Sequence, residues 1–442
     1  MAQEVKLPPT ILVVFGITGD LSQRYLLPAL TQVSKTGHLP NSFQVLGISR
    51  RDVSVAEVLG KKHSRLAKFT EVYKMNLEDA DHYKKLKKKL ASVHRKSGPR
   101  PQIIFYLSVP PAAVLSIVKY LGDAGLNSSR FKLLLEKPFG FDVASARELI
   151  TETTRRFPED QVYRIDHYLA KEMAQNIVVF LGSNALFRDV WNSRFIEKIE
   201  IIVAEKIDIE GRDQFYETTG ALRDIIQSHL LQLAALILIE PGSGAFEHRE
   251  LPGRRLVALT ALSVDQTKPI IRAQYNEYRK QVGSPKSTTE TFVGLTLKSD
   301  DPRWHGVPIL LASGKHLNSK LTEIRIFFKK LENSEANRLV LRIQPKEGIE
   351  LDLWVKEPGY ERRLQKKQLA FNYEQHYDRL PDAYERVLID AFRGSQSLFA
   401  SSSEVLESWR ILEPVQKRWS MDSKDLKFYK PGATVEQVLA LK

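Results

Sequence analysis

Cysteine is missing from this 442-residue sequence. Its absence excludes disulfide bonds, thiolate nucleophiles and metal sites built from cysteine, and it leaves no sign of secretion. Long apolar runs are missing as well, because the most apolar stretch, Leu230–Ile239, is too short to span a bilayer. Residues Met1–Pro9 lack the apolar core of a signal peptide. We therefore expect a cytoplasmic protein that does not insert into membranes.

Acidic residues are the minority among the charged side chains. Lys and Arg number 66 against 53 Asp and Glu, so the formal net charge is +13. Such an excess attracts phosphate groups, both those of nucleic acids and those of small metabolites. Part of it is a lysine run that is typical of a solvated helix face and lacks the aromatic residues that stack on bases. The run comprises Lys84, Lys85, Lys87, Lys88 and Lys89. Nucleic-acid binding is therefore the less favoured interpretation.

Strands and helices alternate in the N-terminal part of the sequence. Four apolar runs are typical of buried strands, and a segment with helical spacing follows each of them. These runs are Ile11–Phe15, Phe43–Gly47, Ile103–Leu107 and Lys132–Leu135. Helix starts are marked by Ser54 with Glu57 as a capping box, by Pro111 and by Asp142. The pattern predicts a Rossmann-like, doubly wound parallel sheet.

From about Arg194 the sequence changes to strand-like stretches without regular helices between them. The stretches are Phe195–Ala204, Arg254–Asp265, Thr291–Leu297, Thr322–Phe328 and Leu339–Gln344. An apolar helix is predicted over Gly220–Ile239, and further helices over Asp382–Phe399 and Glu404–Leu412. We expect an α/β dinucleotide-binding domain over residues 1–175. A larger α+β domain, with a mostly antiparallel sheet flanked by helices, is expected over residues 176–442 for substrate binding and dimerisation.

A turn with two glycines follows the first predicted strand. Glycine lets the backbone approach a pyrophosphate, and the N–H groups and dipole at the start of the next helix attract negative charge. The alternative is an ordinary strand-to-helix turn without a ligand. Because the turn follows the first buried strand, we interpret it as part of a dinucleotide site. The candidate cofactor-binding residues are Gly16, Thr18, Gly19, Asp20 and Leu21.

The end of the second predicted strand indicates which nicotinamide cofactor binds. An Asp or Glu there would hold the ribose 2′-hydroxyl of NAD, but the sequence continues with Arg50 and Arg51. Arginine can hold a 2′-phosphate through charge-assisted, forked hydrogen bonds. The alternative is a pair of surface arginines in a basic protein. We predict NADP as the cofactor, with Arg50 at its 2′-phosphate.

One motif gives the sequence a specific resemblance. Residues Arg164–Glu172 read R-I-D-H-Y-L-A-K-E, which resembles the signature R-I-D-H-Y-L-G-K-E of glucose-6-phosphate dehydrogenases, with Ala170 in place of glycine. Further landmarks of that family follow in the same order along nearly the whole chain. They are Gly16–Leu21 with Pro28, Glu136–Gly140, Arg223-Asp224 through His229–Gln232, Arg303-Trp304 with Gly306–Pro308, Gly314-Lys315, and Leu380–Arg386.

The resemblance implies oxidation of glucose 6-phosphate at C1 to 6-phosphogluconolactone, with hydride transfer to NADP, as in the oxidative pentose phosphate pathway. It also implies a homodimer, or a dimer of dimers, assembled through the antiparallel sheet. The chemistry needs a general base and a nicotinamide but no metal. Two alternatives stay open: a dehydrogenase of another hexose phosphate, and a basic nucleic-acid-binding protein with weakened catalysis.

The catalytic base is a histidine by this reasoning, since imidazole titrates near neutral pH. His229 lies in an apolar helix, where a lone histidine is more often a hydrogen-bonded core residue, but the resemblance places the base there. Two carboxylates could orient it, Asp166 and Asp224. Five residues at about 100° each place Asp224 about 140° around an α-helix from His229, so Asp166 is the better candidate.

Substrate contacts are implied by the resemblance, residue by residue. The phosphate is held by His167, Tyr168 and Lys171, with help from Lys315. Sugar hydroxyls are held by Lys137, Glu205, Asp224 and, less directly, Gln344; Lys137 also contacts the cofactor. Surface ion pairs would be the alternative for Lys315 and Glu205. Lys320 stands where the family's phosphate site has arginine, which would weaken a bidentate grip. Arg342 alone matches part of a second, structural NADP site, so we predict no such site.

Overall fold

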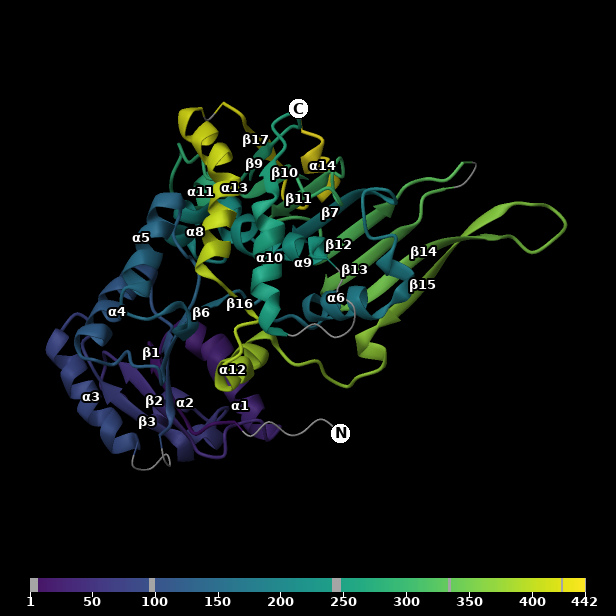
Figure 1. The fold of residues 1–442 in the computed structure, drawn as a ribbon. Helices are drawn as coiled ribbons and strands as arrows, with labels where there is room; N and C mark the ends of the chain where they lie inside the picture. Colours follow the sequence, from purple (N-terminus) through teal and green to yellow (C-terminus); the bar gives the residue numbers. More distant parts are fainter. Residues whose placement is uncertain (1–6, 95–99, 241–247, 333–334, 423, 442) are drawn as a thin grey trace. The chain divides into compact units, whose positions relative to one another are not determined.

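The computed structural model describes residues 7–94, 100–240, 248–332, 335–422 and 424–441 (Figure 1). They form two compact units. The first unit contains residues 1–140, 144–170 and 381–405, and the second contains 141–143, 171–380 and 406–442. Residues 381–405, which sequence analysis assigned to the second domain, thus complete the first unit.

The first unit is built on a seven-stranded sheet. Its strands are β1 (Thr10–Phe15), β2 (Phe43–Ser49), β3 (Thr70–Lys74), β4 (Gln102–Leu107), β5 (Phe131–Leu135), β6 (Val162–Ile165) and β16 (Phe399–Ala400). They lie in the order β16-β6-β5-β4-β1-β2-β3, and only β16 runs antiparallel to its neighbour. The order reverses beside β1, which confirms the predicted doubly wound sheet and its four N-terminal strands.

Helices cover this sheet and close its core. They include α1 (Leu27–Lys35), α2 (Val55–Leu59), α3 (Ala80–His94), α4 (Val114–Asp123), α5 (Val143–Thr154) and α12 (Ala383–Arg393). Ser54 and Glu57 form the predicted capping box before α2. The C-terminal helix α12 packs through Val387, Leu388 and Phe392 into the same apolar core as strand β1. The first unit therefore depends on a segment from near the chain's end.

The second unit contains a larger, mostly antiparallel sheet. Its strands are β7 (Ile196–Ala204), β8 (Leu262–Val264), β9 (Ile271–Tyr275), β10 (Phe292–Ser299), β11 (Ile309–Gly314), β12 (Leu321–Phe328), β13 (Arg338–Gln344), β14 (Gly348–Lys356), β15 (Leu364–Asn372) and β17 (Leu426–Tyr429). The order is β15-β14-β13-β12-β7-β11-β10-β9-β17, with β8 paired to β10. Only β7–β11 and β9–β17 are parallel pairs among these strands. This sheet confirms the predicted α+β class.

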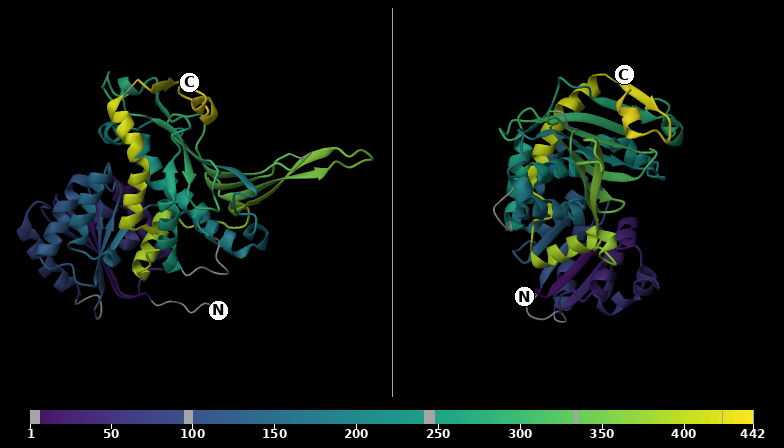
Figure 2. Two further views of the ribbon diagram at one scale, coloured as in Figure 1. Left: turned by 45° about the horizontal axis from the view of Figure 1, so that its top comes forward. Right: turned by 90° about the vertical axis from the view of Figure 1, so that its right-hand side faces the viewer.

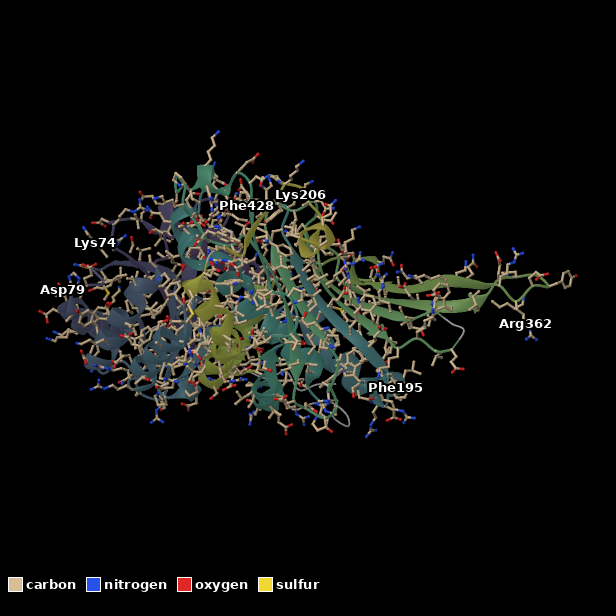
Figure 3. The ribbon with its side chains drawn as sticks, turned by 90° about the horizontal axis from the view of Figure 1, so that it is seen from above. Lys74, Asp79, Phe195, Lys206, Arg362 and Phe428 are labelled. Atoms are coloured by element: carbon tan, nitrogen blue, oxygen red, sulfur yellow. The ribbon has the colours of Figure 1, made fainter. Side chains whose placement is uncertain are left out.

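The hairpin of β14 and β15 extends beyond the other strands of its sheet (Figures 1 and 2). Arg362 lies near its tip (Figure 3). Among the strands that the structure describes, β15 is terminal in this sheet and pairs with β14 alone. The second unit thus presents a long, exposed sheet edge.

Helical segments form the apolar interior of the second unit. Segment α8 (Asp213–Ala221), the π-helix η5 (Leu222–Leu230) and α9 (Leu231–Leu238) follow one another directly. Gly220 has φ +62°, a conformation that suits glycine and breaks the helix between α8 and η5. The whole stretch Asp213–Leu238 is long and apolar enough to cross a membrane, but 83% of its most apolar window is buried inside the protein. Burial of this extent is that of a core helix.

One predicted element in the second half was wrong. Arg254–Asp265 was expected to be a strand, but residues Leu251–Thr260 form helix α10 before the short β8. Its buried residues, Leu251, Arg255, Ala258 and Leu259, follow the helical period, which a reading based on β-branched residues overlooks.

The C-terminal helices also differ from their predicted bounds. Helix α12 ends at Arg393, because Gly394 adopts the left-handed conformation that stops helices. The second helix, α13 (Ser402–Met421), is longer than predicted and continues past Pro414.

Candidate active site

The predicted cofactor residues lie at one edge of the first unit's sheet. Strands β1 and β2 are parallel, and Phe15 pairs with Ile48. Both strands therefore end side by side, and the chain leaves them at Gly16 and at Arg50. Gly47 lies against Ile17, whose side chain would collide with any larger residue there. The edge beside the point where the strand order reverses is where doubly wound sheets bind their ligands.

Gly16 gives the turn after β1 its tight geometry. Its φ of +79° favours glycine, and a Cβ atom would collide with the carbonyl oxygen of Ser108 at the end of β4. The N–H of Gly19 donates to the Gly16 carbonyl at 2.9 Å. The Ser22 hydroxyl donates to the same carbonyl at 3.0 Å, and its oxygen lies within hydrogen-bond distance of Ser108 Oγ at 2.9 Å. The backbone is thus held close to the end of β4, with no room for a side chain at Gly16.

Asp20 and Leu21 open the helix that follows, whose first turn is π-helical (η1, Ser22–Leu26). Asp20, a predicted cofactor residue, is exposed. Its carboxylate forms an ion pair at 2.7 Å with Arg24, one turn later in the same helix. Thr18 is half-buried in the turn. N–H groups in the first turn of a helix have no intrahelical acceptors and can meet an anionic group.

Arg50 follows β2 and is exposed, as is Arg51. Within the part of the chain that the structure describes, neither guanidinium forms an ion pair. The backbone N–H of Arg51 donates to Ser49 Oγ at 3.1 Å, which orients the start of this loop. Two exposed cations without a direct ion pair therefore stand at the same sheet edge as the Gly16 turn, although the charge of Arg51 also acts on Glu57.

Four further predicted residues follow β5 and β6 at this edge. Lys137 comes just after β5, while Asp166, His167 and Tyr168 come directly after β6. Asp166 is buried, with 2% of its surface exposed, and its carboxylate accepts the backbone N–H of Tyr168 at 3.0 Å. The His167 ring makes an edge contact with Tyr168, with ring centroids 5.0 Å apart. The signature motif thus folds its polar groups into a compact turn.

A half-buried acid beside Lys137 was missed by sequence analysis. The hydroxyl groups of Tyr106 and Tyr384 both bond to the carboxylate of Glu136. Burial raises the pKa of Glu136 to about 7, although these hydrogen bonds and the charge of Lys137 act in the opposite direction. The Tyr384 ring also stacks on His167 at 6.2 Å. Glu136 and Tyr384 lie within two of the family motifs named above, Glu136–Gly140 and Leu380–Arg386. Their place in these motifs was the sequence signal that could have identified them.

In the second unit, strands β7 and β11 bring two predicted residues together. They run parallel with Ala204 opposite Gly314, so the next residues, Glu205 and Lys315, are neighbours. The N–H of Glu205 donates to the Gly314 carbonyl at 2.9 Å. The Lys315 ammonium group forms an ion pair with the Glu205 carboxylate.

Lys315 differs from an ordinary surface lysine. Only 2% of its side chain is exposed, whereas 27% of the Glu205 side chain is, so the ion pair joins a buried ammonium group to a half-buried carboxylate. Its backbone is fixed on both sides: its N–H donates to the Thr291 carbonyl at 2.9 Å, and its carbonyl accepts the Tyr429 hydroxyl at 2.6 Å. Burying an ammonium group is unfavourable unless an opposite charge pairs with it. The Glu205 carboxylate supplies that charge here.

Two more predicted residues reach the same edge of the second sheet. Strand β12 begins with Leu321 opposite Ala204, and β13 ends with Gln344 opposite Thr322. The exposed Lys320 directly precedes β12. Lys320 and Gln344 therefore join Glu205 and Lys315 at one sheet edge.

Lys171 lies at the start of helix α6 (Glu172–Ser183). The Lys171 carbonyl accepts the N–H of Gln175 at 3.1 Å. In the first turn, the N–H of Met173 donates to Glu347 Oε2 at 2.5 Å. Because Glu347 lies three residues beyond Gln344, this bond ties the start of α6 to the end of β13.

Asp224 and His229 lie on the π-helix η5, and both are buried. The sequence argument placed them about 140° apart on an α-helix. That premise was wrong, because in a π-helix residues five apart are hydrogen-bonded neighbours on successive turns. The angular argument against Asp224 as the orienting carboxylate therefore fails. The π-helix was not predicted, because a single extra residue per turn leaves no clear signal in the sequence.

The predicted site residues thus form two groups, one in each unit. The first unit holds Gly16–Leu21, Arg50, Lys137, Asp166, His167 and Tyr168, and the second holds Lys171, Glu205, Asp224, His229, Lys315, Lys320 and Gln344. The pairing of Asp166 with His229 stays a prediction.

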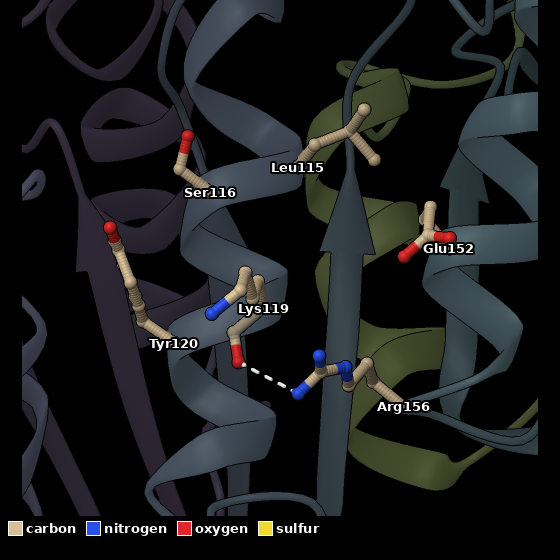
Figure 4. A pocket seen from close by; sticks show the side chains of 6 residues that line it. All are labelled: Leu115, Ser116, Lys119, Tyr120, Glu152 and Arg156. Carbon is tan, nitrogen blue, oxygen red and sulfur yellow. Dashed lines mark hydrogen bonds between the residues drawn. The ribbon is translucent and has the colours of Figure 1, made fainter.

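A separate pocket of about 310 Å³ lies on the first unit (Figure 4). It is lined by Leu115, Ser116, Lys119, Tyr120, Glu152 and Arg156. Lys119 and Arg156 both pair with Asp123, and the Arg156 guanidinium also donates to the Lys119 carbonyl at 3.3 Å. The charges of this pocket are compensated internally, and it contains none of the predicted site residues.

Comparison with known proteins covers nearly all of the chain. The family model "Glucose-6-phosphate dehydrogenase, NAD binding domain" matches residues 13–176, and "Glucose-6-phosphate dehydrogenase, C-terminal domain" matches residues 178–438. Glucose-6-phosphate 1-dehydrogenase of Chlamydia muridarum is 35% identical over 93% of this chain and 91% of its own. The enzyme of that name from Dickeya dadantii is 33% identical over 95% and 93%.

Solved structures give the same result. A glucose-6-phosphate dehydrogenase in complex with its substrate glucose-6-phosphate superposes with a TM-score of 0.91 at 28% identity, covering 98% of this chain and 97% of that one. The glucose-6-phosphate 1-dehydrogenase from Mycobacterium avium gives a TM-score of 0.85 at 31% identity, covering 98% and 96%.

Proposed function

Since this chain belongs to the glucose-6-phosphate dehydrogenase family, we infer that it oxidises glucose 6-phosphate at C1 to 6-phosphogluconolactone, with hydride transfer to a nicotinamide dinucleotide. The main support for this activity is that both family models match along the chain. The family's motifs also occur in the expected order. Neither a nucleic-acid-binding role nor another hexose phosphate is favoured by any comparison.

We propose that NADP is the preferred cofactor. The Gly16 turn supports dinucleotide binding, because it follows β1 at the edge where the strand order reverses and its backbone passes too close to Ser108 for any side chain at Gly16. Arg50, exposed and without an ion pair to a described residue, supports contact with a 2′-phosphate. NADP would supply the hydride acceptor when bound; Gly16, Thr18, Gly19, Asp20, Leu21, Arg50 and Lys137 would hold it.

The chemical step proposed here uses His229 as general base. It accepts the proton of the C1 hydroxyl as the C1–H bond breaks and C1 becomes the carbonyl carbon of the lactone. A carboxylate bonded to its other ring nitrogen would stabilise the imidazolium, as in a Ser-His-Asp triad. Asp166 is the proposed orienting group, and Asp224 is proposed to bind a sugar hydroxyl.

Substrate binding is proposed to use residues of both groups. His167, Tyr168 and Lys171 would hold the dianionic phosphate with Lys315, and Lys320 would add a point charge in place of a bidentate arginine. Lys137, Glu205 and Gln344 would hold sugar hydroxyls. The convergence of Glu205, Lys315, Lys320 and Gln344 at one sheet edge supports this assignment.

We propose a homodimer, or a dimer of such dimers, assembled through the second sheet. Its terminal strand β15 exposes Leu364, Leu369 and Phe371, with 53%, 61% and 37% of their surfaces accessible. An edge strand with exposed apolar residues is prone to pair with another chain. A cytoplasmic location stays a prediction.

The proposed activity is tested by the absorbance of reduced nicotinamide. The full chain is mixed with glucose 6-phosphate and with NADP or NAD in turn, and with mannose 6-phosphate, fructose 6-phosphate and glucose as alternative substrates. We expect the highest kcat/KM with glucose 6-phosphate and NADP. Absence of reduction with glucose 6-phosphate would contradict the activity, and preference for NAD would contradict only the cofactor proposal.

A further inference from the structure

Four tyrosines lie together in the apolar core of the second unit: Tyr216, Tyr275, Tyr278 and Tyr429. Three of them have a hydrogen-bond partner for the hydroxyl group. Tyr275 donates to Gln281 at 2.6 Å, Tyr278 to Glu217 at 2.7 Å, and Tyr429 to the Lys315 carbonyl at 2.6 Å. This is the expected state of a buried hydroxyl, which is unfavourable when left without a partner.

Tyr216 is the exception in this core. It lies on helix α8 with 2% of its surface exposed, and its hydroxyl oxygen is buried without a hydrogen-bond partner among the described residues. A buried hydroxyl that the protein itself does not satisfy calls for a bound water or a ligand atom as its partner.

The surroundings of Tyr216 are those of the candidate substrate site. Lys315 Nζ lies 5.2 Å from the centre of its ring, so the ring also forms one wall for that ammonium group. Burial, reinforced by the charge of Asp224 and then by Glu205 and Glu290, keeps the pKa of Tyr216 far above its ordinary value. The phenol therefore stays protonated and can act as a hydrogen-bond donor.

The chemistry of this environment selects the ligand group. The charges of Asp224, Glu205 and Glu290 all act on the phenol, and the ammonium group of Lys315 lies over its ring. The negative charge of these carboxyl groups disfavours a dianionic phosphate at the phenol itself. A neutral hydroxyl, which accepts from the phenol and donates to a carboxylate, fits both partners.

We propose that Tyr216 is a specificity-determining residue of the reaction: its hydroxyl donates a hydrogen bond to a secondary hydroxyl of the sugar ring beside Asp224. The inference rests on the proposed function, because it takes the sugar phosphate as the ligand. It adds a contact that no motif of the sequence indicated, since Tyr216 precedes the Arg223-Asp224 landmark and resembles an ordinary core aromatic.

The test compares Tyr216→Phe with Tyr278→Phe. The two rings lie 6.1 Å apart in one core, and each substitution removes only a hydroxyl group. For Tyr216→Phe we expect an unchanged or higher melting temperature, because no intramolecular hydrogen bond is lost, and a three- to tenfold higher KM for glucose 6-phosphate with little change in kcat. Tyr278→Phe, which loses its bond to Glu217, should lower the melting temperature and keep the wild-type KM.

Substrate analogues identify the hydroxyl that is contacted. Wild type and Tyr216→Phe are compared with 2-deoxy-, 3-deoxy- and 4-deoxyglucose 6-phosphate. The loss in kcat/KM should vanish with one of the three analogues and persist with the others. An unchanged KM for glucose 6-phosphate, as for a hydroxyl that holds only water, would overturn the inference, and so would an equal loss with every analogue. A wild type inactive on glucose 6-phosphate would instead remove the proposed function.

Discussion

At the residue scale, His229 is the proposed general base for the proton of the C1 hydroxyl. Replacing His229 with Asn keeps a polar side chain in this buried position but removes the base. We expect kcat to fall by about 10²–10⁴ with KM for glucose 6-phosphate within a few-fold of wild type. Steady-state kinetics with a circular dichroism check of folding would measure this. A variant with near-normal kcat would exclude His229 as the base.

The same measurement separates the two carboxylates that could orient the imidazole. Asp166→Asn should lower kcat with a small effect on KM, whereas Asp224→Asn should mainly raise KM for the sugar. The π-helical turn makes this comparison necessary, because it removes the geometric argument against Asp224. The reverse pattern would assign the orienting role to Asp224.

Arg50 gives a prediction about the cofactor. Losing a charge-assisted bond to the 2′-phosphate should lower kcat/KM for NADP by about one to two decades in Arg50→Ala and leave that for NAD nearly unchanged. Arg51→Ala is the matched control, since it removes the same charge from the neighbouring exposed position. Equal losses with both cofactors in Arg50→Ala would indicate stacking on the adenine rather than contact with the phosphate.

Glu136 predicts a pH dependence of stability. Its pKa is raised to about 7 in the folded protein, so folding takes up a proton between pH 4.5 and 7. The stabilisation linked to the protonated carboxyl is complete below pH 4.5 and is lost as the pH rises through 7. Relative to Glu136→Gln, which keeps an acceptor for Tyr106, wild type should lose about 2–3 kcal/mol between pH 5 and 8. Urea unfolding at both pH values measures it; a difference independent of pH would contradict the assignment.

At the element scale, strand β15 is the proposed contact between subunits. Leu369→Lys should reduce the molar mass in solution from twice to once 50.5 kDa, because a charge would be placed on the exposed edge. Light scattering after size exclusion measures the mass. Phe428→Lys on β17, the strand at the opposite end of the same sheet, is the control and should keep the dimer (Figure 3). Loss of the dimer in the control alone would move the contact to β17.

Elements with a strong apolar period were predictable from the sequence, and elements without one were not. Strands β1, β2, β4 and β5 are buried on both faces and read as continuous apolar runs. Strand β15, with the sequence LQKKQLAFN, is largely exposed and gave no signal. The helix α10 was confused with a strand because short apolar segments fit both periods.

The site residues divide in the same way. Arg50 was found because it closes a predicted strand, and Lys315 was found because the family resemblance points to it. Glu136 and Tyr216 were not, because a carboxyl group with a raised pKa and an unsatisfied hydroxyl are properties of the packed fold. Only neighbours from distant parts of the chain create them.

At the scale of the whole molecule, the assignment of residues 381–405 to the first unit sets an order of assembly. Helix α12 fills the core beside α1 and β1, so the cofactor-binding unit lacks part of its interior until that helix has left the ribosome. Residues 171–380 must be synthesised in between, which takes roughly 10–40 s at typical rates of translation. During that interval the nascent first unit exposes the apolar surface that α12 will cover. We therefore expect chaperones to bind this unit during synthesis, although it is translated first.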